Sequence, residues 1–138
     1  MSHEPLISPV NIWPDMLIGY LITIAIETPV LLVGLSARHS LGVRLFAGVW
    51  LTACTYPVLW LVLPQLIPPD REHYVAYLAV GETWVPIAEC VLFWLAFGRS
   101  EEWLKPSMGR DLAAVTVANL ASFGIGMLLQ WIGWWPGP

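Results

Sequence analysis

Apolar residues gather into four long runs along the chain, at about residues 16–35, 43–63, 74–97 and 111–134. A helix that crosses a bilayer needs about 20 mostly apolar residues, and each run meets that length. The segments between the runs are short and contain proline, glycine, serine and charged residues, which are typical of turns. The pattern therefore predicts an all-α polytopic membrane protein, a four-helix transmembrane bundle that forms a single domain over residues 1–138.

The composition points to the same class. Of the 138 residues, 57% are hydrophobic and 12% are charged, whereas a soluble domain carries about 25% charged residues. The net charge of −4 argues against a nucleic-acid partner, and the lipid bilayer is the expected one. The beginning of the chain lacks the positive region of a cleavable signal peptide.

The basic residues predict an orientation, because connections rich in lysine and arginine stay in the cytoplasm. Arg38 and Arg44 flank the first connection, and Arg99, Lys105 and Arg110 belong to the third. The second connection has a single arginine, and neither terminus has any. We therefore expect loops 36–42 and 98–110 to be cytoplasmic, and both termini to lie outside, in a bacterial inner membrane.

Every run contributes polar side chains to one band at membrane depth. These residues are Glu27, Tyr56, Glu82, Glu89, Asn119 and Ser122. At a rise of 1.5 Å per residue, counting inward from the outer end of each run gives three levels. The levels hold Tyr56 with Glu82, then Glu27 with Ser122, then Glu89 with Asn119, about 10 Å further in than the first pair. The sequence thus predicts a polar core that all four helices share.

The three glutamates must face the inside of the bundle. Glu82 and Glu89 are seven residues apart and share one helix face. Three carboxylates facing lipid would cost roughly 8–10 kcal/mol in total, from about 2.5–3.5 kcal/mol each. No lysine or arginine lies deep in any run, so we expect protonation or a bound cation to neutralise them. A protonated Glu89 is expected to donate to Asn119, and a protonated Glu82 to Tyr56.

Prolines and glycines suggest how the helices are shaped and packed. Pro29, Pro57 and Pro86 each lie inside a run and leave the carbonyl four residues earlier without its helix donor. We expect kinks at these prolines, which would either splay the bundle around a cavity or be healed by side-chain hydrogen bonds. In the fourth run, Gly124 and Gly126 favour close packing against another helix.

Several chemistries are disfavoured. No histidine lies at mid-membrane depth to ligate a tetrapyrrole or to form a catalytic pair with serine. Asp15, Asp70 and Asp111 all lie at boundaries, which argues against an aspartyl intramembrane protease. No set of residues has the spacing of a metal site. We therefore predict no catalytic residue, no metal and no cofactor, and we do not expect an enzyme.

Two resemblances bear on these residues. The stretch "YLITIAIETPVLL" resembles the first helix of the small multidrug resistance transporters, in which one membrane glutamate exchanges protons for cationic drugs. On that resemblance Glu27 would be this glutamate. Because the match covers only about a tenth of the chain and the other spans depart from that family, we interpret it as convergence.

A fuller pattern consists of "ETP", "TYPVLW", two glutamates seven residues apart and "ANLASF", in this order. It resembles a group of small four-span bacterial membrane proteins of unassigned function. The resemblance implies a four-helix core with Glu27, Tyr56, Glu89 and Asn119 turned inward, and it transfers no activity.

Three functions follow as hypotheses. The first is a non-catalytic subunit of a larger membrane complex, since the chain has no soluble domain and its surfaces are rich in tryptophan and glycine. The second is a proton- or cation-coupled small transporter, with Glu82 as the outer step, Glu27 as the middle step and Glu89 as the inner step. Such a small bundle would need to form a homo-oligomer. The third is a quinone- or lipid-handling component in which Tyr56 or a glutamate acts as acid and base.

Overall fold

The computed structural model describes residues 12–98 and 106–134, and all regular structure in these residues is helical. The elements are α1 (Ile12–Gly34), α2 (Leu41–Pro57), the π-helical segment η1 (Val58–Val62), α3 (Leu63–Leu66), α4 (Tyr74–Phe97) and α5 (Pro106–Trp131). Because α2, η1 and α3 follow one another without a gap, they form one long rod. Four helices are thus long and apolar enough to span a membrane, which confirms the all-α, multi-pass expectation.

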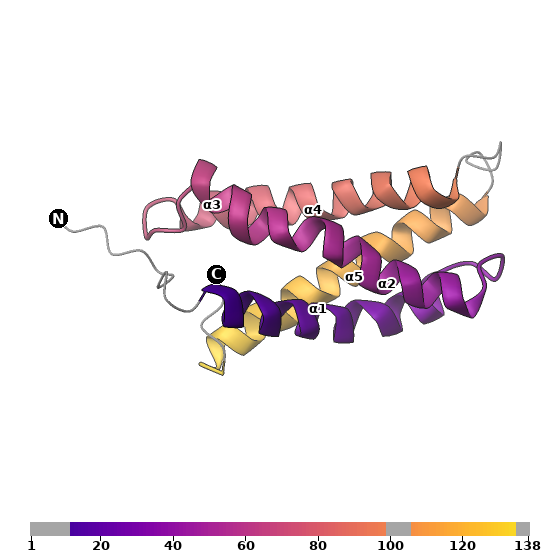
Figure 1. Ribbon diagram of the computed structural model, residues 1–138, viewed down its shortest axis with the longest axis horizontal. Helices are drawn as coiled ribbons and strands as arrows, with labels where there is room; N and C mark the ends of the chain where they lie inside the picture. Colours follow the sequence, from indigo (N-terminus) through magenta and orange to yellow (C-terminus); the bar gives the residue numbers. More distant parts are fainter. Residues whose placement is uncertain (1–11, 99–105, 135–138) are drawn as a thin grey trace.

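The spans run alternately up and down. The beginning of α1, the end of α5 and the connection 67–73 lie at one end of the bundle, on the left of Figure 1. The turn between α1 and α2 lies at the opposite end. The closest packing is that of α1 against α2 and α5, while α4 packs against α5 and α2. The sides of the membrane stay a prediction, and Arg99, Lys105 and the chain ends lie outside the described residues.

Two helices begin earlier than the apolar runs predict. The first starts at Ile12 rather than near residue 16, and the last starts at Pro106 rather than near residue 111. In both cases the additional first turn contains charged residues, Asp15 in α1 and Arg110 in α5. Hydropathy marks the part of a helix that fits the bilayer core, whereas backbone hydrogen bonding continues into the interface.

The three interior prolines behave differently. The α-helix continues through Pro29 in α1 and through Pro86 in α4. After Pro57, in contrast, the helix widens into the π-helical segment η1. Single π turns are frequent at functional sites, and this one borders the cavity described below.

A tyrosine from another helix repairs the hydrogen bonding of the π turn. The N–H of Leu63 donates to the carbonyl of Val58, five residues earlier. In this register the donor for the Leu59 carbonyl would be residue 64, which is a proline and has no N–H. The Tyr77 hydroxyl of α4 donates to the Leu59 oxygen instead, at 3.0 Å. Tyr77 therefore supplies a side-chain donor at this break, while the kinks expected at Pro29, Pro57 and Pro86 stay a prediction.

Close helix contact occurs at other glycines than those predicted. A Cβ added to Gly48 would lie 2.5 Å from the Thr28 hydroxyl oxygen and 3.0 Å from the Thr28 Cα, so α1 and α2 touch there. At Gly124 and Gly126 no atom of the described chain lies within 4 Å of an added Cβ. Close packing at these two glycines therefore stays a prediction, and Gly126 lines the cavity described below.

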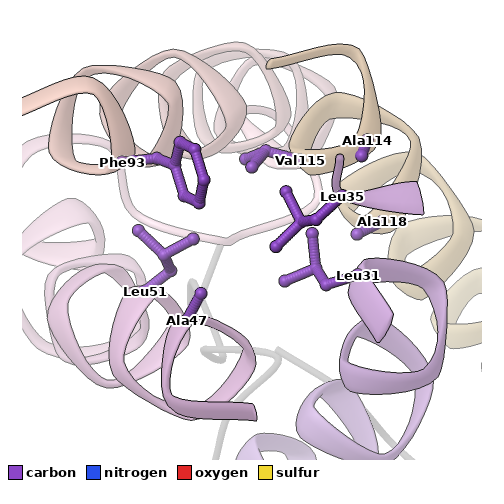
Figure 2. Close-up of a cluster of buried hydrophobic side chains, with 8 residues drawn as sticks. All are labelled: Leu31, Leu35, Ala47, Leu51, Phe93, Ala114, Val115 and Ala118. Carbon is purple, nitrogen blue, oxygen red and sulfur yellow. The ribbon is translucent and has the colours of Figure 1, made fainter. Parts of the chain in front are cut away.

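An apolar core fills the bundle between the polar band and the α1–α2 turn (Figure 2). Its alanines come from α2 and α5, and its larger side chains come from all four spans and from the turn after α1. The buried members are Leu31, Leu35, Ala47, Leu51, Phe93, Ala114, Val115 and Ala118. The polar groups therefore lie on the far side of a close-packed apolar layer from this turn.

Candidate functional site

A cavity of about 100 Å³ lies among the four spans, beside the apolar core. One water needs about 10–15 Å³ on this measure, so the space admits several waters or a small ligand. Its polar lining consists of Thr23, Glu27, Thr52, Thr55, Tyr56, Glu82, Glu89, Asn119, Ser122 and Gln130. All six residues predicted for the polar band are in this set, and no lysine, arginine or histidine is.

Glu27 of α1 is held by two hydroxyl groups from different helices. Thr52 Oγ1 of α2 donates to Glu27 Oε2 at 2.8 Å. Ser122 Oγ of α5 donates to Glu27 Oε1 at 2.7 Å. The Glu27 side chain is buried, with 2% of the residue exposed. Both carboxylate oxygens thus have a hydrogen-bond donor, and neither donor carries a charge.

Glu89 of α4 is held in a similar way. Thr55 Oγ1 of α2 donates to Glu89 Oε1 at 2.8 Å. Asn119 Nδ2 of α5 donates to Glu89 Oε2 at 2.8 Å. The structure therefore brings Glu89 and Asn119 together at one level, as the depth count expects, but the amide is the donor and the carboxylate the acceptor. Again neither partner is charged.

The similar surroundings of Glu27 and Glu89 follow from the spacing of their donors along α2 and α5. Thr52 and Thr55 are three residues apart on α2, and Asn119 and Ser122 are three residues apart on α5, so each pair shares a helix face. One member of each pair reaches Glu27 and the other reaches Glu89. The two threonines were missed from the sequence, although their spacing repeats that of the pair on α5.

Glu82 and Tyr56 do not form the predicted pair. Both line the cavity, but no hydrogen bond joins them in the described structure. The Tyr56 ring packs between Tyr20, at a centroid distance of 5.8 Å, and Trp60, at 5.9 Å. Glu82 is partly exposed and has no hydrogen bond to any described side chain. The number of residues from the outer end of a span gives the depth of a residue but not the direction of its side chain. The depths of Glu82 and Tyr56 therefore could not show whether the two side chains meet.

A third buried carboxylate, Asp111 of α5, lies on the other side of the apolar core. Its Oδ1 accepts the Ser36 backbone N–H at 2.6 Å, and its Oδ2 accepts the Ser36 hydroxyl at 3.0 Å. The same Oδ2 lies 2.7 Å from Arg38 Nη2 and 3.0 Å from His39 Nε2. The sequence marked Asp111 only as a boundary residue, yet it ties the α1–α2 turn to α5.

Two further arginines cap the end of α1, where the last carbonyl groups have no partner within the helix. Arg44 Nη1 donates to the Leu32 carbonyl at 2.7 Å, and Arg110 Nε donates to the Gly34 carbonyl at 2.9 Å. Arg44 and Arg110, which belong to the orientation signal, therefore also have local structural partners.

The donor set does not favour a metal. Among the residues that the structure describes, no three histidine, cysteine, aspartate or glutamate side chains are placed to hold a metal ion. The carboxylate oxygens of Glu27 and Glu89 face hydrogen-bond donors, and in particular the amide nitrogen of Asn119. Such donors suit carboxylates and oppose a bound metal.

Compared with known proteins, the chain matches no family model, no curated protein and no solved structure. The function is therefore argued from the geometry of the cavity and from the chemistry of the groups that line it.

Proposed function

We propose that this chain is a small membrane transporter or ion pathway that binds a cation or a proton at Glu27, Glu82 and Glu89. The observation that carries the proposal is the cavity that these three carboxylates share without a basic residue in its lining. Ionisable residues within membrane spans are expensive to bury and are associated with ion and proton pathways. A structural role alone would be met by neutral side chains at lower cost.

The three carboxylates have different parts in this proposal. Glu82, which accepts no hydrogen bond from a described side chain, is the group that exchanges with the cavity. Glu27 and Glu89 each accept two hydrogen bonds from neutral groups and hold the ion further in. The order from the outside is Glu82, Glu27 and Glu89, as expected from their levels along the helices.

The other two hypotheses make different predictions. A subunit of a larger complex would copurify with a stoichiometric membrane partner in mild detergent. A quinone- or lipid-handling protein would retain such a molecule in the cavity and would depend on Tyr56. The cavity with its acidic lining favours the pathway.

The test is ion flux into vesicles that contain the purified protein. Internal dyes for pH and for monovalent cations would report influx driven by a gradient of each ion. Glu27→Gln and Glu89→Gln are expected to abolish the flux, because each removes a charge site and keeps the shape of the side chain. Glu72→Gln is the matched control, since Glu72 lies in the exposed connection before α4. Flux unaffected by both Glu27→Gln and Glu89→Gln would refute the pathway.

A further inference from the structure

The hydroxyl groups around Glu27 each face two acceptors. Thr52 Oγ1 lies 2.8 Å from Glu27 Oε2 and 3.1 Å from the carbonyl of Gly48. Ser122 Oγ lies 2.7 Å from Glu27 Oε1 and 2.9 Å from the carbonyl of Asn119. A hydroxyl has one hydrogen and can donate to only one of these acceptors at a time. Each hydroxyl can therefore point its hydrogen either to the carboxylate or to its own helix.

The surroundings of Glu89 contain one such hydroxyl and one fixed donor. Thr55 Oγ1 lies 2.8 Å from Glu89 Oε1 and 3.2 Å from the carbonyl of Leu51. Asn119 Nδ2 has two hydrogens and donates to both Glu89 Oε2 and the carbonyl of Val115, at 2.8 and 3.0 Å. The contact with the Val115 carbonyl fixes the orientation of the amide, because its oxygen would face another acceptor there.

This arrangement satisfies both protonation states of the carboxyl groups. When Glu89 is ionised, Thr55 and Asn119 donate to its two oxygens. When Glu89 is neutral, its proton resides on Oε1 and is donated to the Thr55 oxygen, while the Thr55 hydrogen turns to the Leu51 carbonyl. Glu27 has the same choice on either oxygen, through Thr52 or Ser122. The only events are the addition of one proton and the rotation of a hydroxyl, and no heavy atom has to move.

We propose that the ion taken up by this site is the proton, and that Thr52, Thr55 and Ser122 are positioning residues that let Glu27 and Glu89 change protonation state in place. This inference rests on the proposed function and specifies its ion. The hydrogen-bond geometry favours the proton over a metal cation. Every carboxylate oxygen of the pair already faces a donor, and a metal at Glu89 Oε2 would be repelled by the Asn119 amide.

The titratable neighbours of the pair are few. Tyr56 faces the pair from α2, and Glu82 faces it from α4. Cys90 adjoins Glu89 on α4 and contacts Thr116. The lining residues that α5 contributes are not titratable. None of these neighbours is a lysine, arginine or histidine, so within the cavity lining the Glu82 carboxyl is the group that can exchange a proton with Glu27 and Glu89.

Infrared difference spectroscopy of the full chain in lipid nanodiscs tests this inference. Lowering the pH is expected to produce a protonated-carboxyl band that Glu89→Gln removes. Thr55→Val should move this band to higher frequency, because the acid loses its hydrogen-bond partner, and should slow proton flux about tenfold. Thr55→Ser keeps the hydroxyl and should restore both. Thr83→Val is the matched control, since Thr83 donates only to its own helix, at the Ala79 carbonyl.

The outcomes separate this inference from the proposed function. Flux of sodium or potassium that needs Glu89, without a protonated-carboxyl band that Glu89→Gln removes, would overturn the inference and leave the pathway standing. A carboxyl band that responds to Thr55→Val, in a protein that moves no ion, would support proton binding and overturn the pathway. If Thr55→Val does not fold, a normal band in Thr55→Ser and its loss in Glu89→Gln still decide the assignment. A band at the same frequency in wild type and in Thr55→Val overturns the role of the hydroxyl.

Discussion

The two buried carboxylate clusters of this bundle differ in the charge of their partners. Asp111 is within reach of Arg38 and His39, and its residue is 0% exposed. Glu27 and Glu89 are equally secluded, at 2% exposure each, but every partner that donates to them is a hydroxyl or an amide. Asp111 thus has a positively charged side chain beside it, whereas Glu27 and Glu89 have only neutral hydrogen-bond donors.

The comparison separates a fixed charge from an exchangeable one. A buried ion pair does not by itself show that the fold is more stable. Removing one partner, however, leaves the other charge buried without compensation, and this strongly destabilises the fold. A carboxyl group that has only neutral donors can lose its charge by protonation with all its partners kept. Asp111 therefore belongs to the scaffold, whereas Glu27 and Glu89 suit a changing occupancy.

The largest effect is expected for Asp111→Asn. Losing the negative charge beside Arg38 and His39 should lower the free energy of unfolding by about 3 kcal/mol. Thermal unfolding in mild detergent, followed by tryptophan fluorescence, would measure it. An unfolding midpoint equal to that of the wild type would show that Asp111 is not part of the scaffold and would break the comparison.

The next effect concerns the contact that places Thr52 beside Glu27. Gly48→Ala introduces a Cβ that meets the Thr28 hydroxyl and backbone, and overpacking of this kind costs about 1–3 kcal/mol. Gly124→Ala is its control, because an added Cβ meets nothing there, and it should change stability by less than about 1 kcal/mol. Equal stabilities of the two variants would contradict the close α1–α2 contact.

A smaller effect is expected when Glu89 itself is neutralised. In Glu89→Gln the new amide can donate to Thr55 while its oxygen accepts from Asn119, so every hydrogen bond keeps a partner. The free energy of unfolding should then change by less than about 1 kcal/mol, whereas the proposed ion flux should be lost. Chemical unfolding of the two variants side by side would show whether Glu89→Gln destabilises as much as Asp111→Asn, which would mean that Glu89 is a fixed charge as well.

The smallest effect belongs to a partly exposed carboxylate, Asp70, in the connection before α4. Its Oδ1 accepts the backbone N–H groups of His73, at 2.9 Å, and of Glu72, at 3.0 Å. These bonds, with the His73 side chain, lower the pKa of Asp70 from its ordinary value of 3.8. A carboxyl with a depressed pKa stabilises the fold above its unfolded pKa and loses that effect as the pH falls through the folded one. The stability difference between wild type and Asp70→Asn should thus begin to shrink below about pH 4 and vanish once the pH has fallen through the folded pKa of Asp70, which lies below 3.8. A difference that does not shrink as the pH is lowered from neutral would contradict this.

The sequence was sufficient for the spans and for the membership of the polar band. Long apolar runs leave little choice of architecture, and three glutamates that cannot face lipid must turn toward each other. The levels of Glu27 with Ser122 and of Glu89 with Asn119 followed from the helix rise alone. Each of these pairs is hydrogen-bonded in the structure.

The parts that could not be predicted depend on rotation about the helix axis and on local breaks. Thr52 and Thr55 look like ordinary residues of an apolar helix until the facing glutamates are placed. The π turn at Val58–Val62 shifts the residues after Pro57 relative to a regular helix, so the direction of a side chain such as Trp60 was not calculable from spacing. Asp111 lies near a span end by hydropathy, and only the folded α1–α2 turn brings Arg38 to it.

The arginine caps on α1 bear on how the chain is assembled. On the predicted orientation, Arg44 and Arg110 belong to the group of charges that keeps this end of the bundle in the cytoplasm during insertion. Lysine would serve that step equally well. The planar guanidinium, however, lets Arg44 reach both the Leu32 and Ser36 carbonyls, at 2.7 and 3.2 Å, and a single ammonium group lacks that fork. Arg44→Lys should therefore keep the orientation of the chain in the membrane and weaken the contact between α1 and α2. The positive charge of Arg44 thus serves membrane insertion, whereas its guanidinium geometry serves the packing of the folded helices.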